Sequence, residues 1–129
     1  MIDDDARCPC GTGETYGACC GRFHGGRPAP TAELLMRSRF SAFAAGDAAY
    51  LLATWHPSTR PGSVEPDPAL RWYRLDVHGT AGGGPFDAEG GVDFSAHWRG
   101  ADGARGTQRE SSRFRREGGR WFYVDGAAG

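Results

Sequence analysis

The sequence predicts an α+β protein in which a cysteine-rich segment precedes two helices and then four strands. This prediction rests on three observations. All four cysteines lie within residues 8–20, apolar residues recur with a helical period through residues 31–55, and they alternate with polar residues from residue 72 onward. Because the strands follow one another without an intervening helix, we expect an antiparallel meander packed against the helices.

The composition limits the kinds of function. A chain of 129 residues suffices for one domain of about 100 residues and a small appendage. The net charge of −1 gives no general attraction to nucleic acid, so we expect no specific DNA binding. No apolar stretch approaches the ~20 residues of a membrane span, and the acidic residues 1–5 do not resemble a signal peptide. We therefore expect a soluble, cytoplasmic protein without a membrane role.

The N-terminal cysteines have the spacing of a metal site. One residue separates Cys8 from Cys10. Eight residues separate Cys10 from Cys19, and Cys20 follows directly. Four sulfurs this close in sequence can form a tetrahedral all-thiolate shell around zinc, with Zn–S bonds of about 2.3 Å. Neighbouring cysteines can share such a shell only where the backbone turns sharply, as at the start of a helical turn, and we expect one structural zinc ion per chain.

Other uses of these residues explain the pattern less well. A disulfide between Cys19 and Cys20 would join Cα atoms about 3.8 Å apart, below the usual range of about 4.4 to 6.8 Å. Buried free thiols would not explain the clustering. His24 could replace one thiolate, although four cysteines already complete a zinc shell. The metal module is expected within residues 1–26, and a proline-containing connector leads to a second unit at residues 31–129.

Two helices are expected at the start of the second unit. Thr31 is a good N-cap for the first helix, and Gly46 is a good residue to end it. Asp47 then caps a second helix that ends before residue 56. The apolar faces of these helices and of the strands should supply the core residues Phe40, Phe43, Trp55, Leu75, Phe94 and Phe122.

The period changes to two after a loop, and four strands follow. They are expected within residues 72–78, 92–98, 107–116 and 120–124. Glycine-rich turns join them, and the spacing of the glycines is not that of a phosphate-binding loop. In the first strand, strict alternation puts four side chains on the face opposite Leu75, namely Trp72, Arg74, Asp76 and His78.

Residues 8–21 resemble the SEC-C motif, a zinc-binding segment also found at the C-terminal tail of the SecA translocation ATPase. The motif has the form C-x-C-x8-C-[HC], usually with Gly-Ser-Gly-Lys after the second cysteine and an aromatic residue before the third. Tyr16 matches the aromatic residue, whereas Thr12 and Glu14 stand where serine and lysine are usual. The resemblance implies the metal ligands Cys8, Cys10, Cys19 and Cys20.

The rest of the chain resembles the YchJ family of uncharacterised bacterial proteins. The matching stretches lie at residues 35–43, 54–57, 92–94, 111–114 and 119–126, so that with the SEC-C segment they cover nearly the whole chain in order. The resemblance implies a cone-shaped α+β domain like that of nuclear transport factor 2, in which helices and a curved sheet surround a cavity. It implies no established activity.

Polar residues of the strands and of the preceding loop are candidates for a function. Alternation groups Asp76 with His78, and Asp93 with His97. A carboxylate and a histidine that face into the cavity could support acid–base chemistry, although each pair could equally be the solvent side of a half-buried strand. The candidates for a cavity or partner surface are His56, Trp72, Asp76, His78, Asp93, His97, Arg113 and Arg115.

Two kinds of function fit these residues. Alternate arginines of the third strand could form a patch for an anionic partner, unless Glu110 and Glu117 pair with them. The first function is a zinc-stabilised binding or adaptor module for a protein or RNA partner. The alternative is a small-molecule binder or general acid–base enzyme that uses the cone cavity. Four thiolates leave zinc no open coordination position, so catalysis by the metal is not expected and the binding module is preferred.

Overall fold

The structure is a computed structural model, and it describes residues 2–128 of the chain. Within these residues, three helices precede four strands. The helices are α1 (Cys20–His24), α2 (Ala32–Ala45) and α3 (Ala48–Ala53). The strands are β1 (Leu70–Gly82), β2 (Glu89–Gly100), β3 (Arg105–Glu117) and β4 (Arg120–Ala128). They pair antiparallel in the order β1-β2-β3-β4, so the predicted meander is confirmed.

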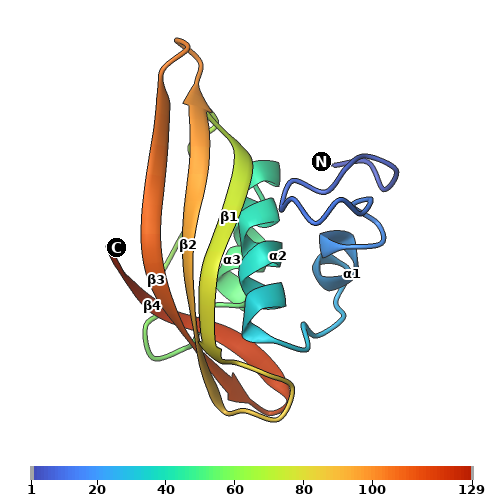
Figure 1. The fold of residues 1–129 in the computed structure, drawn as a ribbon, viewed down its shortest axis with the longest axis vertical. Coiled ribbons are helices and arrows are strands. Elements are labelled where there is room, and N and C mark those ends of the chain that lie inside the picture. Colours follow the sequence, from blue (N-terminus) through green and yellow to red (C-terminus); the bar gives the residue numbers. More distant parts are fainter. Residues whose placement is uncertain (1, 129) are drawn as a thin grey trace.

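The elements form three layers (Figure 1). The sheet is one layer, α2 lies along one of its faces, and α1 with the N-terminal loop lies on the side of α2 away from the sheet. Helix α2 therefore contacts both the cysteine segment and the sheet. None of the helices within residues 2–128 is long and apolar enough to cross a membrane.

Capping residues define both ends of α2 and the start of α3, as the sequence predicts. The Thr31 hydroxyl accepts a hydrogen bond from the backbone N–H of Leu34 at 3.1 Å. Gly46 ends α2 with a φ of +71°, a left-handed conformation that favours glycine. The Asp47 carboxylate then accepts from the N–H of Tyr50 at 3.1 Å and starts α3. Local chemistry thus determines where both helices begin and where α2 ends.

A β-bulge in β1 changes the face on which Trp72 lies. The pairing with β2 shifts between Trp72 and Arg74, so Tyr73 is an extra residue in the ladder. Trp72 consequently faces α2, with its ring centroid 6.4 Å from that of Phe40, while Tyr73 is 38% exposed. The expectation that Trp72 shares a face with Asp76 is wrong, because strict alternation holds only in a strand without a bulge.

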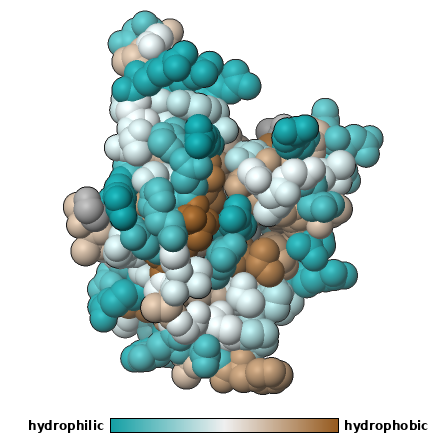
Figure 2. Space-filling view, in the orientation of Figure 1, coloured by the Kyte–Doolittle hydropathy of each residue, from teal (hydrophilic) through white to brown (hydrophobic). Residues whose placement is uncertain are grey.

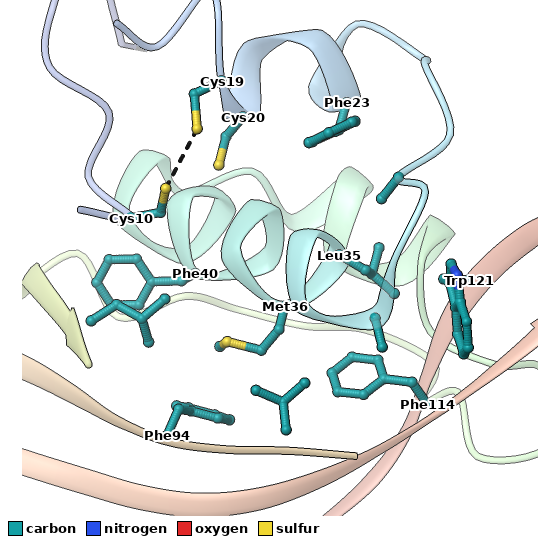
Figure 3. Close-up of a cluster of buried hydrophobic side chains, with 14 of the residues drawn as sticks. Cys10, Cys19, Cys20, Phe23, Leu35, Met36, Phe40, Phe94, Phe114 and Trp121 are labelled. Carbon is teal, nitrogen blue, oxygen red and sulfur yellow. Dashed lines mark hydrogen bonds between the residues drawn. The ribbon is translucent and has the colours of Figure 1, made fainter. Parts of the chain in front are cut away.

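The core lies between α2 and the sheet and continues around α2 into the cysteine segment (Figure 3). Figure 3 shows Met36 of α2 pointing toward the sheet, while Cys20 lies on the opposite side of the helix. Of the predicted core residues, Phe40, Leu75 and Phe94 are buried. The other three, Phe43, Trp55 and Phe122, are half-buried.

The surface is mostly hydrophilic on the face seen in Figure 2, with hydrophobic atoms confined to small patches. Phe86 follows β1 and is 94% exposed. A single exposed aromatic side chain does not make a docking surface. The candidate sites are therefore the cysteine cluster, the polar face of the sheet and the interior.

Candidate functional site

The four cysteines converge at one point. Their sulfur atoms all lie within 4.8 Å of one another, and all four side chains are buried. The sulfurs of Cys10 and Cys19 are 3.6 Å apart, close to the roughly 3.8 Å edge of a tetrahedron with 2.3 Å Zn–S bonds. None of the four forms a disulfide. The cluster therefore has the ligands and the size of a tetrahedral metal site.

The local backbone explains this convergence. Gly11 and Gly13 have φ values of +86° and +89°, which let the chain double back after the first cysteine pair. The N–H of Cys8 donates to a backbone carbonyl across this loop at 2.9 Å. Cys19 is the N-cap of α1 and Cys20 is its first residue. The adjacent cysteines thus lie at the start of a helical turn, as the sequence predicts.

Helix α2 contacts the cysteine cluster through polar side chains. The buried Ser41 hydroxyl lies 3.5 Å from the sulfur of Cys8 and can donate to a thiolate there. Arg37 donates through Nη1 to the carbonyl of Cys10 at 2.8 Å. Glu33 holds the same guanidinium at 3.0 Å. These contacts tie the cysteine loop to one side of α2.

The four crowded thiols cannot all ionise together unless a cation binds them, because hydrogen bonds from Cys10 and Cys20 lower the pKa of Cys8 while the same contacts keep its neighbours protonated. Hydrogen bonds with Cys10 and then Cys8, followed by burial, raise the pKa of the Cys20 thiol far above its usual range. A divalent cation reverses this preference, because it stabilises all the thiolates at once. The residues present therefore fit a tetrahedral metal ion held by Cys8, Cys10, Cys19 and Cys20.

His24 supports the cluster without being a ligand. Its Nε2 lies 2.8 Å from the carbonyl of Ser38, to which it donates, so in the neutral ring Nδ1 accepts from the Tyr16 hydroxyl. The ring also packs against Tyr50, with 4.5 Å between the ring centroids. Both ring nitrogens are thus engaged, and the histidine links the cysteine segment to α2.

The candidate acid–base residues lie on the face of the sheet away from α2. Asp76 pairs with His97 across β1 and β2, with Oδ2 and Nε2 2.8 Å apart. His78 instead contacts a serine hydroxyl at 2.7 Å, and Asp93 accepts from Arg109 at 3.1 Å. Asp76 with His78, and Asp93 with His97, therefore share a face as alternation predicts, but neither pair is hydrogen-bonded, and the face is the one away from the cavity, which was the alternative considered. The residues of β1 and β2 that face α2 are apolar, and cross-strand register decides which polar groups meet.

The arginines of β3 are ion-paired with acidic residues. Arg113 makes two hydrogen bonds with Asp125 in β4, at 2.6 and 2.5 Å, and lowers the pKa of that carboxyl. Arg115 lies 3.5 Å from Glu89 of β2 and 3.8 Å from Glu117. Ion pairs therefore account for the positions of these arginines, but of the two partners considered Glu117 takes part and Glu110 forms no salt bridge within residues 2–128.

His56 lies outside the cavity and acts as a structural link. It is 7% exposed, and its Nε2 lies 2.8 Å from the carboxylate of Glu117. Its Nδ1 lies 2.7 Å from the hydroxyl of Ser58, and its backbone N–H donates to the carbonyl of Tyr123 at 2.7 Å. These bonds fasten the loop after α3 to the β3–β4 hairpin.

An internal cavity of about 250 Å³ lies between α2 and the sheet. Exposed Gln108 lines its edge, so the cavity reaches the surface there. Of the candidate residues from the sequence, Trp72 lines it and the others do not. The apolar part of the wall consists of Met36, Phe40, Phe43, Trp55, Trp72, Phe94, Ala96 and Phe114.

Arg39 of α2 is a buried charge in the cavity wall. It is 6% exposed, and its Nη1 donates to the carbonyl of Leu51 at 2.8 Å and to the hydroxyl of Thr54 at 2.7 Å. Its guanidinium carbon lies 4.6 Å from the ring centroid of Tyr123. Burial lowers the pKa of Arg39 to about 10, so the side chain is still protonated at neutral pH.

Trp55, Glu110 and Tyr123 add further polar groups to the wall. The indole Nε1 of Trp55 is buried and has no hydrogen-bond partner within the part of the chain that the structure describes. Glu110 accepts through Oε2 from the Ser112 hydroxyl at 2.5 Å and from the Tyr123 hydroxyl at 3.5 Å. Burial, followed by the charge of Glu110, raises the pKa of Tyr123 to about 12. The wall thus includes a buried guanidinium and a carboxylate, and the charge of Glu110 acts on both Arg39 and Tyr123.

Arg39 and Glu110 are not among the cavity residues expected from the sequence. From the sequence, Glu110 is considered only as an alternative partner of the β3 arginines, yet it alternates with Phe114 on the inner face of β3, so strand periodicity places it there. Arg39 gives no such signal, because it lies beside the apolar stripe of α2 that contains Phe40. Only the position of α3, which supplies its hydrogen-bond acceptors, explains its burial.

This fold and these sites define a class of protein in which an N-terminal cysteine cluster that fits a metal ion precedes an α+β domain with a four-stranded antiparallel sheet. A family model described as "YchJ, middle NTF2-like domain" matches residues 31–126, and the SEC-C motif matches residues 6–22. The chain therefore belongs to the YchJ family, and the expected family and fold class are confirmed.

Relatives and solved structures agree with this assignment. A UPF0225 protein from Corynebacterium efficiens is 59% identical over 122 residues, which cover 94% of this chain and 92% of that protein. One from Streptomyces avermitilis is 56% identical, covering 94% of this chain and 84% of that protein. The solution structure of a SEC-C motif protein from Rhodopseudomonas palustris has a TM-score of 0.82 at 34% identity, covering 95% of this chain and 98% of that chain. A crystal structure of a SEC-C motif protein from Psychrobacter arcticus, at 24% identity and TM-score 0.80, covers 100% of this chain and 86% of that chain and has the same fold.

Proposed function

We propose that this protein binds a small molecule in the cavity and that a structural zinc ion holds one wall of the cavity in place. The observation that supports the proposal is that α2 belongs to both sites. Arg37 and Ser41 contact the cysteine cluster, while Met36 and Phe40 line the cavity. A fixed α2 keeps the cavity preformed, which lowers the cost of binding a ligand.

Zinc is the metal that four cysteine ligands suit best. A complete thiolate shell leaves no position for a substrate, so the ion contributes to folding, on the order of 10 kcal/mol locally, and does no chemistry. Metal analysis of protein purified under reducing conditions should find one zinc per chain. The Cys20→Ser variant should lose it, whereas a change of the exposed Ser63 to alanine should not. Substoichiometric zinc in the wild type would contradict this part of the proposal.

The cavity favours binding over catalysis. His97 and Asp76 lie on the opposite face of the sheet, and within residues 2–128 no histidine lines the cavity. The titratable groups in the wall are Arg39, Glu110 and Tyr123, of which the first and last keep their protons at neutral pH. We therefore propose a ligand and not a reaction.

Ligand-observed NMR with a library of small fragments tests the cavity site. The Ala96→Leu variant fills the cavity from a buried position and should abolish binding. The matched Ser111→Ala variant changes an exposed side chain of β3 and should bind as the wild type does. The NMR spectrum of each variant shows whether it is folded. A wild type that binds no fragment, or a folded Ala96→Leu variant that binds all of them, would contradict the proposal.

A protein or RNA partner is a second candidate, favoured by the exposed arginines of β3. The bidentate pair between Arg113 and Asp125 opposes it, because a partner would have to compete with that carboxylate. Affinity capture from lysate with the wild type and an Arg113→Ala, Arg115→Ala double variant tests this candidate. A partner that is lost with the arginines would support it, and equal capture by both proteins would count against it.

A further inference from the structure

Three arginines form a row across the outer face of the sheet, the face away from α2. Arg71 of β1 lies directly opposite Arg99 of β2, and Arg99 lies directly opposite Arg105 of β3. Residues that lie directly opposite each other share a face, and the next residue, Trp72, faces α2, so the three arginines face away from it. With neighbouring strands about 4.8 Å apart, this arginine row spans about 10 Å.

The arginine row forms no salt bridge within residues 2–128, and all three side chains are exposed. Four other arginines of the same face are each ion-paired, namely Arg74, Arg109, Arg113 and Arg115. Asp102, in the turn after β2, lies toward the other face, because its Oδ1 is 2.8 Å from the place where a Cβ of Gly100 would lie, beside Trp98. Like charges opposite each other in a sheet repel, so the arginine row gains from a bound anion.

The net charge of −1 does not describe this end of the sheet. Exposed Asp3, Asp4 and Asp5 precede the cysteine cluster, and the N-terminal loop lies on the side of α2 away from the sheet (Figure 1). The hairpin of β2 and β3 extends beyond the end of α2 in the same view, and the arginine row lies near its turn. A polyanion can therefore reach the arginine row without meeting the acidic N-terminus.

Tyr73 places an aromatic ring beside the arginine row. The bulge in β1 turns this residue to the outer face, where it is 38% exposed. The guanidinium carbon of Arg99 lies 4.6 Å from the centroid of its ring. Proteins bind single-stranded nucleic acid by combining positive side chains for the phosphates with aromatic rings on which unpaired bases stack. A base can stack on the exposed part of this ring or on the guanidinium over it, whereas an acidic peptide would use the charges alone.

Thr107 offers a contact that favours RNA over DNA. It lies two residues after Arg105 on the same strand, and its exposed hydroxyl is 2.9 Å from Nδ1 of His97. Nε2 of this histidine lies 2.8 Å from the Asp76 carboxylate, to which it donates, so in the neutral ring Nδ1 accepts the proton of the Thr107 hydroxyl. The oxygen of Thr107 is then free to accept a hydrogen bond. A ribose 2′-hydroxyl can donate to it, and deoxyribose lacks this group.

We infer that the outer face of the sheet binds single-stranded RNA beside the turn between β2 and β3. Phosphates contact the arginine row, a base stacks at Tyr73, and a 2′-hydroxyl donates to Thr107. None of these contacts reads the edge of a base, so we expect little sequence preference. The surface does not include Arg113 or Arg115, and the inference does not rest on the cavity ligand.

Fluorescence anisotropy of a labelled oligouridylate of about 12 nucleotides, titrated with the zinc-loaded protein, tests the inference. Contacts with three phosphates predict that the logarithm of the binding constant falls with the logarithm of the salt concentration with a slope of about −2. Arg71→Gln with Arg105→Gln should weaken binding at least about tenfold and reduce the slope to about −0.7. The matched double variant, Arg109→Gln with Arg113→Gln, removes the same charge from ion-paired arginines of the same face and should weaken binding by less than about threefold.

Two single variants test the other contacts. Tyr73→Leu should weaken binding at least about fivefold and leave the salt slope unchanged, because stacking releases no counterions. The wild type should bind the oligouridylate at least about threefold more tightly than the deoxyuridylate of the same length. Thr107→Val should remove this preference, since it deletes the hydroxyl and keeps the shape of the side chain.

The possible failures are distinguishable, and the NMR spectrum of each variant shows whether it is folded. If the wild type does not bind the oligouridylate, or if folded Arg71→Gln with Arg105→Gln keeps the wild-type affinity and slope, the inference is wrong. Equal losses in the two double variants would show that total charge, and not the arginine row, drives binding. If polyglutamate displaces the RNA and Tyr73→Leu changes nothing, the partner is an acidic protein instead. Equal binding of the deoxyuridylate would overturn the choice of RNA. None of these results bears on the cavity ligand.

Discussion

Replacing Phe40 with alanine should destabilise the protein by about 3 to 5 kcal/mol. Phe40 is 3% exposed, and its ring meets Trp72 edge-on with 6.4 Å between centroids. A buried aromatic side chain removes roughly 150–250 Å² from water, worth about 4–6 kcal/mol at about 25 cal/mol per Å², and alanine retains a part of this. Because the ring borders an existing cavity, its loss enlarges a void and places the cost within this range.

Urea unfolding of the zinc-loaded protein under reducing conditions measures this cost. With a slope of about 1–3 kcal/mol per M for a small protein, the midpoint should fall by on the order of 2 M. Phe86→Ala is the matched control, because this phenylalanine is 94% exposed and its loss should change stability by less than about 0.5 kcal/mol. A loss below about 1 kcal/mol for Phe40→Ala would refute the packing of this face of α2 against the sheet.

Two predictions concern titration. Tyr50 and Tyr123 should ionise near pH 12 in an ultraviolet absorbance titration, because burial raises the pKa of each to about 12. Tyr50→Phe and Tyr123→Phe should each remove one of the two groups that ionise near pH 12. The side chain of an unfolded tyrosine ionises near pH 10. The stability that comes from burying Tyr50 and Tyr123 is therefore present below about pH 10 and is lost as the pH rises through about 12. Ionisation of either tyrosine near pH 10 in the folded protein would contradict its burial. The hydrogen bond with His97, followed by that with Arg74, lowers the pKa of Asp76, so NMR titration of its carboxyl carbon should show a higher value in His97→Gln. The stability that Asp76 gains from these hydrogen bonds is present above the pKa of Asp76 in the unfolded chain and is lost as the pH falls through its pKa in the folded protein. An unchanged pKa of Asp76 in His97→Gln would contradict the pair of Asp76 and His97.

Local signals in the sequence were sufficient for the ends of the helices and for the cysteine cluster. Thr31, Gly46 and Asp47 act within a few residues of themselves, so the sequence alone fixes the ends they cap. The cysteines likewise lie within one short loop, and their convergence follows from spacing and from the turn at Cys19. The structure confirms the helix ends and the convergence of the cysteines, because each depends on contacts between near neighbours in the chain, whereas the bound metal stays a prediction.

Strand periodicity is enough to place Glu110, but the partners of the other polar residues could not be predicted because they depend on register. One extra residue at Tyr73 reverses the face of Trp72, and no glycine or proline in the sequence marks this bulge. The partner of Asp76 is His97, 21 residues away, because β1 and β2 pair in one particular register. Arg39 becomes a cavity residue only when α3 folds back to accept its hydrogen bonds. Such contacts join distant segments and leave no local pattern.

Amide hydrogen exchange of α2, measured with zinc bound and after chelation, tests most directly the claim that this helix is shared by the metal site and the cavity. Removal of zinc should increase the exchange rate of the α2 amides by roughly tenfold or more, because Arg37 and Ser41 lose an ordered cysteine loop to contact. Amides in the middle of β2 should change much less, since their partners are β1 and β3. If the exchange of α2 does not depend on zinc, or if β2 loses protection equally, zinc does not act on the cavity through α2.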